Sequence, residues 1–146
     1  MICPDSIIRV SRSASAERRD RVAQAVSWYR AIQTGVYVGR HGKGGGEAEA
    51  LRFDYGKIRH LFSAITSSEN GWGSFFSSNG LTPLVLYYED LAARYVDTVR
   101  SVLDFLRLDQ DGVEVPQPKN EKYADALSLQ WIEQFKLEHG RARSAR

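Results

Sequence analysis

The spacing of apolar residues predicts a helix that begins near Asp20 and ends at Gly35. Within this segment apolar side chains recur every three or four residues, which gathers them on one face of a helix. These side chains are Val22, Ala25, Val26, Tyr29 and Ile32. Aspartate is a good N-cap, and glycine readily takes the left-handed conformation that ends many helices. The pattern therefore predicts both ends of the helix as well as its buried face.

Three further segments show the same helical period, namely 54–78, 92–107 and 121–139. Asn79-Gly80 is a turn signal that ends the first of them. Its apolar positions are Ile58, Leu61, Phe62, Ile65, Trp72, Phe75 and Phe76. A stripe of this kind is more often core than ligand site, so we expect it to be buried.

Two stretches are candidates for strands. The apolar and aromatic run from Leu84 to Tyr88 predicts a parallel strand that is buried on both faces. The β-branched run Ser6–Val10 is a shorter candidate, and a polar, serine-rich connector is expected at 11–17. Glu89 and Asp90 could be mistaken for a catalytic carboxylate pair. Their place at a strand-to-helix junction favours capping instead, with Asp90 as the cap of the next helix.

The order strand, helix, long helix, strand, helix, helix predicts a helix-rich α/β fold with few parallel strands. At 146 residues, of which 42% are hydrophobic, the chain fits a single domain over 1–146. Parallel sheets normally have more than two strands. We therefore expect that something outside this chain completes the sheet, or that the chain is part of a larger domain.

Two segments are expected to lie outside these elements. The glycine-rich stretch 39–50 does not match the phosphate-loop pattern GxxxxGK[ST] and follows a helix, so a flexible loop is predicted there. The C-terminal stretch 140–146, which includes RARSAR, is expected to be a frayed basic tail.

Charge and cysteine content argue against several kinds of protein. The net charge of +2 comes from 20 basic and 18 acidic residues, so no overall field favours nucleic acid or anionic lipid. A single cysteine, Cys3, excludes an internal disulfide and fits a reducing cytoplasm. The three histidines lie far apart, so no metal site is predicted. Neither a signal peptide nor a membrane span is indicated.

A basic cluster runs directly into the first predicted helix. Arginines stand at positions 18, 19 and 21, and Ser27 follows on the helix with Ala23 and Ala31 one turn to either side. Arginines before a helix are usually solvated surface, and a serine in mid-helix usually has no special role. On the residues alone, this stretch is the best candidate for binding an anion.

Several stretches, taken in order, resemble the C-terminal portion of bacterial trehalose 2-sulfotransferase-like enzymes. They are RRDRVAQAVSWYRAIQTG, WGSFFSSNG, PLVLYYEDL, YVDTVRSVLDFLRL and KYADALSLQWIEQF. More distantly, the arginine-to-serine stretch and YYEDL are similar to parts of cytosolic sulfotransferases. The resemblance covers residues 18–137 and draws its specificity from the order and separation of the motifs.

The resemblance implies a partial P-loop-type sulfotransferase fold. It also implies transfer of a sulfuryl group from 3′-phosphoadenosine 5′-phosphosulfate (PAPS) to a hydroxyl of a carbohydrate or glycolipid acceptor. In the family, an arginine and a serine eight residues later bind the 3′-phosphate, and Arg19 and Ser27 match that pair. They would also bind the product, 3′-phosphoadenosine 5′-phosphate (PAP). Tyr88 matches a tyrosine that lies near the adenine in related sulfotransferases.

The resemblance also implies parts that this chain does not contain. In the family, the serine/threonine-rich phosphosulfate loop and the catalytic base belong to an N-terminal half, so the catalytic residue here is unknown. We expect 1–17 to be a divergent start, because SRSASAE stands where the family strand runs almost directly into the arginine motif. We also expect the chain alone to be inactive.

Three interpretations stay open. The chain could supply the 3′-phosphate-binding part of a sulfotransferase that a complementing N-terminal half completes. It could be a non-catalytic remnant that binds PAP. It could also be an interaction module, in which uncovered Trp72, Phe75 and Phe76 dock onto a partner or form a homo-oligomer.

Overall fold

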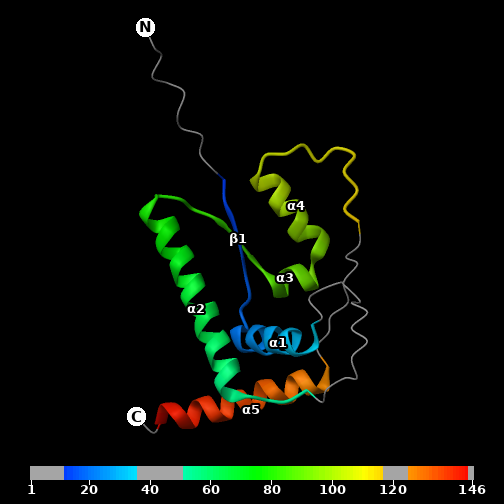
Figure 1. The fold of residues 1–146 in the computed structure, drawn as a ribbon. Coiled ribbons are helices and arrows are strands. Elements are labelled where there is room, and N and C mark those ends of the chain that lie inside the picture. The colour runs from blue at the N-terminus through cyan, green and yellow to red at the C-terminus, as the bar shows by residue number, and fades with distance from the viewer. Residues whose placement is uncertain (1–11, 36–50, 117–124, 145–146) are drawn as a thin grey trace. The chain divides into compact units, whose positions relative to one another are not determined.

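The computed structural model describes residues 12–35, 51–116 and 125–144. Within these ranges the elements are β1 (Ala14–Glu17), α1 (Arg21–Thr34), α2 (Tyr55–Ser78), β2 (Leu84–Tyr87), α3 (Tyr88–Ala93), α4 (Tyr95–Phe105) and α5 (Ala126–Ser144) (Figure 1). This helix-rich arrangement with two parallel strands confirms the α/β class. The chain divides into two compact units; one boundary falls between Glu17 and Arg18, and another falls between Asn70 and Gly71, within α2.

Helix α1 has the ends that the sequence predicts. The Asp20 carboxylate accepts a hydrogen bond from the backbone N–H of Ala23 at 2.8 Å, and Gly35 ends the helix with a φ of 67°. That positive φ suits glycine, which has no Cβ to clash. Ala25 and Val26 are fully buried, as predicted for the apolar face. Ile32, in contrast, is 49% exposed and lies outside that face.

Helix α2 also begins and ends as predicted. Asp54 caps it by accepting from the backbone N–H of Lys57 at 2.9 Å. After Ser78 the chain turns at Gly80, where φ is 62°, and the N–H of Leu81 returns to the carbonyl of Phe76 at 2.9 Å. Of the predicted stripe, Ile58 and Ile65 are buried.

One unit contains α1, the first part of α2, and α5, and it holds the buried apolar core. The core residues are Ala25, Val26, Tyr29, Ile58, Ile65, Trp131 and Phe135. Trp131 of α5 packs against the Tyr29 ring of α1 with centroids 6.0 Å apart, and against the Phe53 ring at 5.9 Å. Burying these rings removes a large apolar area from water, which is the main force that holds α1 in place.

Helix α5 is longer than predicted at its C-terminal end. The sequence predicts a helix to His139 and a frayed basic tail from 140, but α5 continues to Ser144. The tail prediction is therefore wrong for residues 140–144. Arginine is a good helix former, and cations are favoured near a helix C-terminus, which explains why Arg141 and Arg143 continue the last turns. Residues 121–124 and 145–146 lie outside the described part.

The start of α5 is fastened to α1 by one ion pair. The Arg30 guanidinium donates to both carboxylate oxygens of Asp125, at 2.5 and 2.7 Å, and also to the Ser128 hydroxyl. Asp125 in turn caps α5 by accepting from the backbone N–H of Ser128 at 2.8 Å. A bidentate arginine–carboxylate pair is among the stronger polar contacts in proteins. This pair joins two segments that are 95 residues apart.

The pH dependence of stability should reveal this pair. Its hydrogen bonds from Arg30 and from the Ser128 backbone lower the pKa of Asp125 from 3.8 to about 2. Because the folded-state pKa lies below the unfolded one, the stabilisation is complete above pH 3.8 and is lost as pH falls through about 2. Asp125→Asn keeps a capping side chain but loses the charge. We expect its urea midpoint to lie below that of wild type at pH 7, with the gap narrowing between about pH 4 and 2. A constant gap would contradict this assignment.

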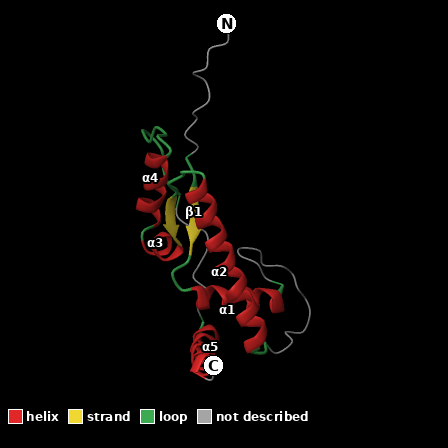
Figure 2. Cartoon of the chain, turned by 90° about the vertical axis from the view of Figure 1, so that its left-hand side faces the viewer, coloured by secondary structure: helices red, strands yellow, loops and turns green. Residues whose placement is uncertain are grey.

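The other unit contains the two-stranded sheet. Strands β1 and β2 are parallel, with Ala14 opposite Leu84 and Glu17 opposite Tyr87 (Figure 2). The prediction of a polar connector at 11–17 is therefore wrong for 14–17. This segment contains no β-branched or aromatic residue, so its strand propensity is low, and it is a strand because it pairs with β2. The predicted strand at 6–10 lies outside the described residues.

The region after β2 differs from the prediction in three ways. β2 ends at Tyr87, and it is not buried on both faces, since Val85 is 38% exposed. The predicted helix 92–107 is instead two helices, α3 and α4, separated at Arg94, where φ is −140° and ψ is 58°. Asp90 lies within the first turn of α3 and is not the N-cap residue of either helix, since the N-cap residues are Tyr87 and Arg94. An apolar period continues through a one-residue break, so the pattern could not reveal it.

The C-terminus of α4 is held by Arg12. Its guanidinium donates to the carbonyl of Phe105 and lies 5.8 Å from the centroid of the Phe105 ring. A cation at the carbonyl end of a helix is favourable, and it also satisfies a carbonyl that has no partner inside the helix.

No helix in the described ranges is long and apolar enough to cross a membrane.

Candidate functional site

The arginine cluster lies at the junction between β1 and α1. β1 ends at Glu17, Arg18 and Arg19 follow, and Asp20 caps α1. A strand therefore leads directly into the arginine motif. Residues 14–17, which were predicted as part of a connector before the arginine motif, are therefore the strand itself. Arg19 itself is exposed.

Ser27 lies on the side of α1 that faces away from the core. Ala25, Val26 and Tyr29 form the buried side, whereas Ser27 is exposed. Ala23 and Ala31, one turn before and after it, are half-buried and have only methyl side chains. Seven residues separate the Asp20 cap from Ser27, a rise of about 10 Å along the helix. The structure thus places Arg19 and Ser27 in one unit, both accessible to a ligand.

The neighbouring arginines have structural contacts. Arg21 forms an ion pair with Glu69 of α2, and Arg30 forms an ion pair with Asp125. These contacts fix α1 against α2 and α5. These two contacts therefore hold the helix that carries Ser27 and that directly follows Arg19.

Tyr88 belongs to the other unit, where it is the first residue of α3 and is 43% exposed. The sequence predicts it at the end of a strand, but the strand ends one residue earlier. Glu89 and Asp90 follow it in the first turn of α3. The predicted site residues are therefore divided between the units, with Arg19 and Ser27 in one and Tyr88 in the other.

Comparison with known proteins decides the family. The family model described as Stf0 sulphotransferase matches residues 8–138, which include all three predicted site residues. This chain belongs to the Stf0 sulphotransferase family. The resemblance predicted from the order of the motifs is confirmed.

Two curated relatives of this Stf0 chain are both named trehalose 2-sulfotransferase. The trehalose 2-sulfotransferase of Mycobacterium tuberculosis (strain Erdman) is 34% identical over 121 residues, which are 83% of this chain and 44% of the relative. The trehalose 2-sulfotransferase of Mycolicibacterium smegmatis is 33% identical over 121 residues, or 82% of this chain and 43% of the relative. The chain thus spans less than half the length of the curated relatives it matches.

An exposed aromatic cluster ends α2 in this Stf0 chain. Trp72, Phe75 and Phe76 pack against one another with ring centroids 5.7–5.8 Å apart. Trp72 is 56% exposed and Phe75 is 49% exposed. The predicted burial of the whole stripe is therefore wrong at this end, because a helical period shows which residues share a face but not what covers that face.

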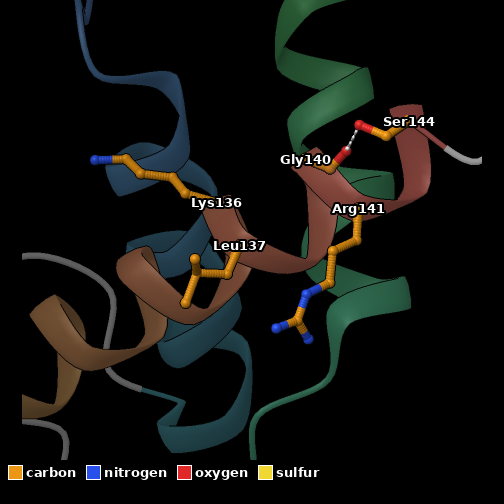
Figure 3. Close-up of a pocket in the computed structure, with 5 residues that line it drawn as sticks. All are labelled: Lys136, Leu137, Gly140, Arg141 and Ser144. Atoms are coloured by element: carbon orange, nitrogen blue, oxygen red, sulfur yellow. Dashed lines mark hydrogen bonds between the residues drawn. The ribbon is translucent and has the colours of Figure 1, made fainter.

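One hollow in the described part of the Stf0 chain contains none of the predicted site residues. It is an open depression of about 540 Å³ on α5, lined by Lys136, Leu137, Gly140, Arg141 and Ser144 (Figure 3). The Ser144 hydroxyl donates a hydrogen bond to the carbonyl of Gly140 at 3.2 Å. The Lys136 ammonium nitrogen lies 3.4 Å from a carboxylate oxygen of Glu133. The two cationic side chains point in different directions in Figure 3. No group of three or more potential metal ligands occurs among the described residues.

Trp28 is a residue that the apolar period did not single out. It directly follows Ser27, lies off the stripe of Val22, Val26 and Tyr29, and is 42% exposed. The sequence could have identified Trp28 by its position. An aromatic residue outside the apolar face of an amphipathic helix is not needed for packing against the core.

Proposed function

We propose that this chain takes part in PAPS-dependent sulfuryl transfer to a hydroxyl of a carbohydrate or glycolipid acceptor, and that Arg19 and Ser27 bind the 3′-phosphate of the donor. The observation that carries the proposal is the Stf0 match over 8–138, together with the exposure of Arg19 just before α1 and of Ser27 on α1. The name trehalose 2-sulfotransferase, borne by both relatives, supports an acceptor of the carbohydrate class.

The chemistry of the pair suits a phosphate. A guanidinium offers a planar fork of N–H donors to phosphate oxygens, and the serine hydroxyl adds a directional donor. A nucleotide without a 3′-phosphate would leave the Arg19–Ser27 pair unused. The pair therefore distinguishes PAP from adenosine 5′-phosphate (AMP).

In the proposed reaction the acceptor hydroxyl attacks the sulfur of PAPS in line, and PAP leaves. The part of this chain is to hold the 3′-phosphate and so to fix the position of the nucleotide, which lowers the entropic cost of reaching the reactive geometry. No described residue is assigned as the base. We propose that the phosphosulfate loop and the base belong to the part of the relatives' length that residues 1–146 do not match, and that these 146 residues by themselves bind nucleotide without turnover. A single cysteine supports a reducing location such as the cytoplasm.

The interaction module is the second candidate, and the exposed Trp72–Phe75–Phe76 cluster favours it. Such a surface would associate with a partner or with a second copy through burial of apolar area. The interaction-module candidate predicts that the chain has no preference for a 3′-phosphorylated nucleotide. The same binding experiment therefore separates the two candidates.

Isothermal calorimetry with PAP and AMP tests the proposed function. We expect wild type to bind PAP at least about tenfold more tightly than AMP, because charged hydrogen bonds to the 3′-phosphate are worth about 1.5–3 kcal/mol. Ser27→Ala should weaken PAP binding by about fivefold to tenfold and leave AMP binding unchanged. Ser63→Ala, which alters an exposed serine of α2 in the same unit, is the matched control. Equal affinities of wild type for PAP and AMP would overturn the proposal.

A further inference from the structure

We propose that Trp28 is the stacking surface for the base of the nucleotide whose 3′-phosphate is held at Ser27. This inference rests on the proposed function and extends it from the phosphate to the nucleoside. Three observations support it: the exposure of the Trp28 ring, its position beside Ser27, and the apolar surface that continues from it along α1.

Trp28 is exposed in a unit that buries its other tryptophan. Trp131 is 3% exposed and is held between the Tyr29 and Phe53 rings, whereas Trp28 is 42% exposed. The core face of α1 is complete without Trp28, since Ala25, Val26 and Tyr29 fill it. A large aromatic ring left partly in water next to a polar site residue is typical of a ligand contact.

The helix places the ring where a base would lie. Ser27 and Trp28 have Cα atoms about 3.8 Å apart, and their side chains leave the helix about 100° apart. In a nucleotide, the 3′-phosphate and the base are both attached to one ribose, so a base cannot lie farther than one sugar from the phosphate. A 3′-phosphate at Ser27 therefore brings the base within reach of the neighbouring indole.

The surface next to the ring is also apolar. Ile32 lies one helical turn after Trp28 and is 49% exposed. Residues four apart share a face of a helix, so Trp28 and Ile32 form one exposed shelf beside Ser27. The exposed side of α1 thus changes from polar to apolar across a short distance. This succession matches a ligand with an anionic group and a flat ring, and it does not require Tyr88, which belongs to the other unit.

Base-to-aromatic stacking strengthens binding by about 5- to 100-fold per base and tolerates different bases. Stacking therefore acts on PAP and AMP alike, because both contain adenine. Arg19 and Ser27 act on the 3′-phosphate, which only PAP contains. The two contributions can be measured separately.

The experiment measures PAP and AMP binding to Trp28→Phe, Trp28→Leu and wild type, with helicity checked by circular dichroism. We expect Trp28→Leu, which is apolar but has no ring, to weaken both nucleotides by the same factor of about five or more. Trp28→Phe should keep most of the affinity. Trp72→Leu, which alters an exposed tryptophan of the other unit, is the control and should leave both affinities unchanged.

Fluorescence gives a second readout. Stacking of adenine on Trp28 should quench tryptophan emission on addition of PAP, and Trp28→Phe should abolish that quenching. Undiminished quenching in Trp28→Phe, or wild-type PAP affinity in Trp28→Leu, would overturn the inference. If Trp28→Leu lost trehalose binding but kept PAP binding, the ring would belong to the acceptor site and the inference would also be overturned. Failure of the proposed function looks different, because wild type would then bind PAP and AMP equally.

Discussion

Replacing Arg19 with alanine is expected to weaken PAP binding by about 10- to 100-fold while AMP binding changes little. Hydrogen bonds to a charged group contribute about 1.5–3 kcal/mol, and the guanidinium supplies two or more of them to a phosphate. Arg19 is exposed at the start of α1, so its removal should leave the core intact. Calorimetric titration of each nucleotide, with urea unfolding of the same preparations, measures both expectations.

Two further variants sharpen the Arg19 test. Arg19→Lys keeps the charge but loses the planar fork, and it should fall between wild type and Arg19→Ala. Arg59→Ala removes an exposed arginine of α2 in the same unit and corrects for the general loss of positive charge. If Arg59→Ala weakened PAP as much as Arg19→Ala did, the effect would be long-range electrostatics, and the assigned contact would be wrong.

Phe135→Ala should lower the free energy of unfolding by about 3–5 kcal/mol, the usual cost of deleting a buried phenyl ring. Phe135 is 1% exposed and lies where α5 meets the start of α2. Its ring is 5.3 Å from that of Tyr55 and 5.8 Å from that of Phe62, and His139 stacks on it at 5.4 Å. A cavity there would leave several rings without a neighbour. Urea unfolding followed by circular dichroism measures the change.

The control for Phe135 lies on the same helix. Leu137 is 63% exposed, and Leu137→Ala should change the free energy of unfolding by no more than about 0.5 kcal/mol. Phe135→Leu, which retains most of the apolar volume, should fall between the two. Similar losses in Phe135→Ala and Leu137→Ala would show that α5 does not use this face for packing.

The two helices with clear end signals were predictable from sequence. Asp20 and Gly35 bound α1, and Asp54 and Gly80 bound α2, because capping and positive φ are local properties that a few residues specify. The buried face of α1 followed from its period for the same reason. Local chemistry determines these features, so the order of residues is enough to reveal them.

Features that depend on distant partners were not predictable. β1 consists of small and polar residues and is a strand because it pairs with β2, which lies 70 residues later, as the register Ala14 to Leu84 shows. The exposure of Trp72 and Phe75 likewise depends on what covers α2 and not on its own pattern. The break at Arg94 interrupts an apolar period that continues on both sides.

The candidate site was predictable only in part. On residues alone, an arginine before a helix and a serine within it are ordinary surface, and it was the resemblance that singled out Arg19 and Ser27. The structure adds that Arg19 is exposed just before α1 and that Ser27 is exposed on it. Arg21 and Arg30 of this helix form ion pairs with Glu69 and Asp125. Trp28 was not predicted, because hydrophobic periodicity identifies the residues of the buried face and this ring lies off that face.

The pairing of α1 with α5 has a consequence for synthesis of the chain. Arg30 emerges from the ribosome 95 residues before Asp125, its partner, and Tyr29 emerges long before Trp131. Domains assemble from contacts that exist only when both partners have been made, and distant contacts form late. Helix α1, which carries Ser27 and directly follows Arg19, therefore acquires its fixed position only after Asp125 and Trp131 have been made. Until then, its apolar side is available to chaperones and to other nascent chains.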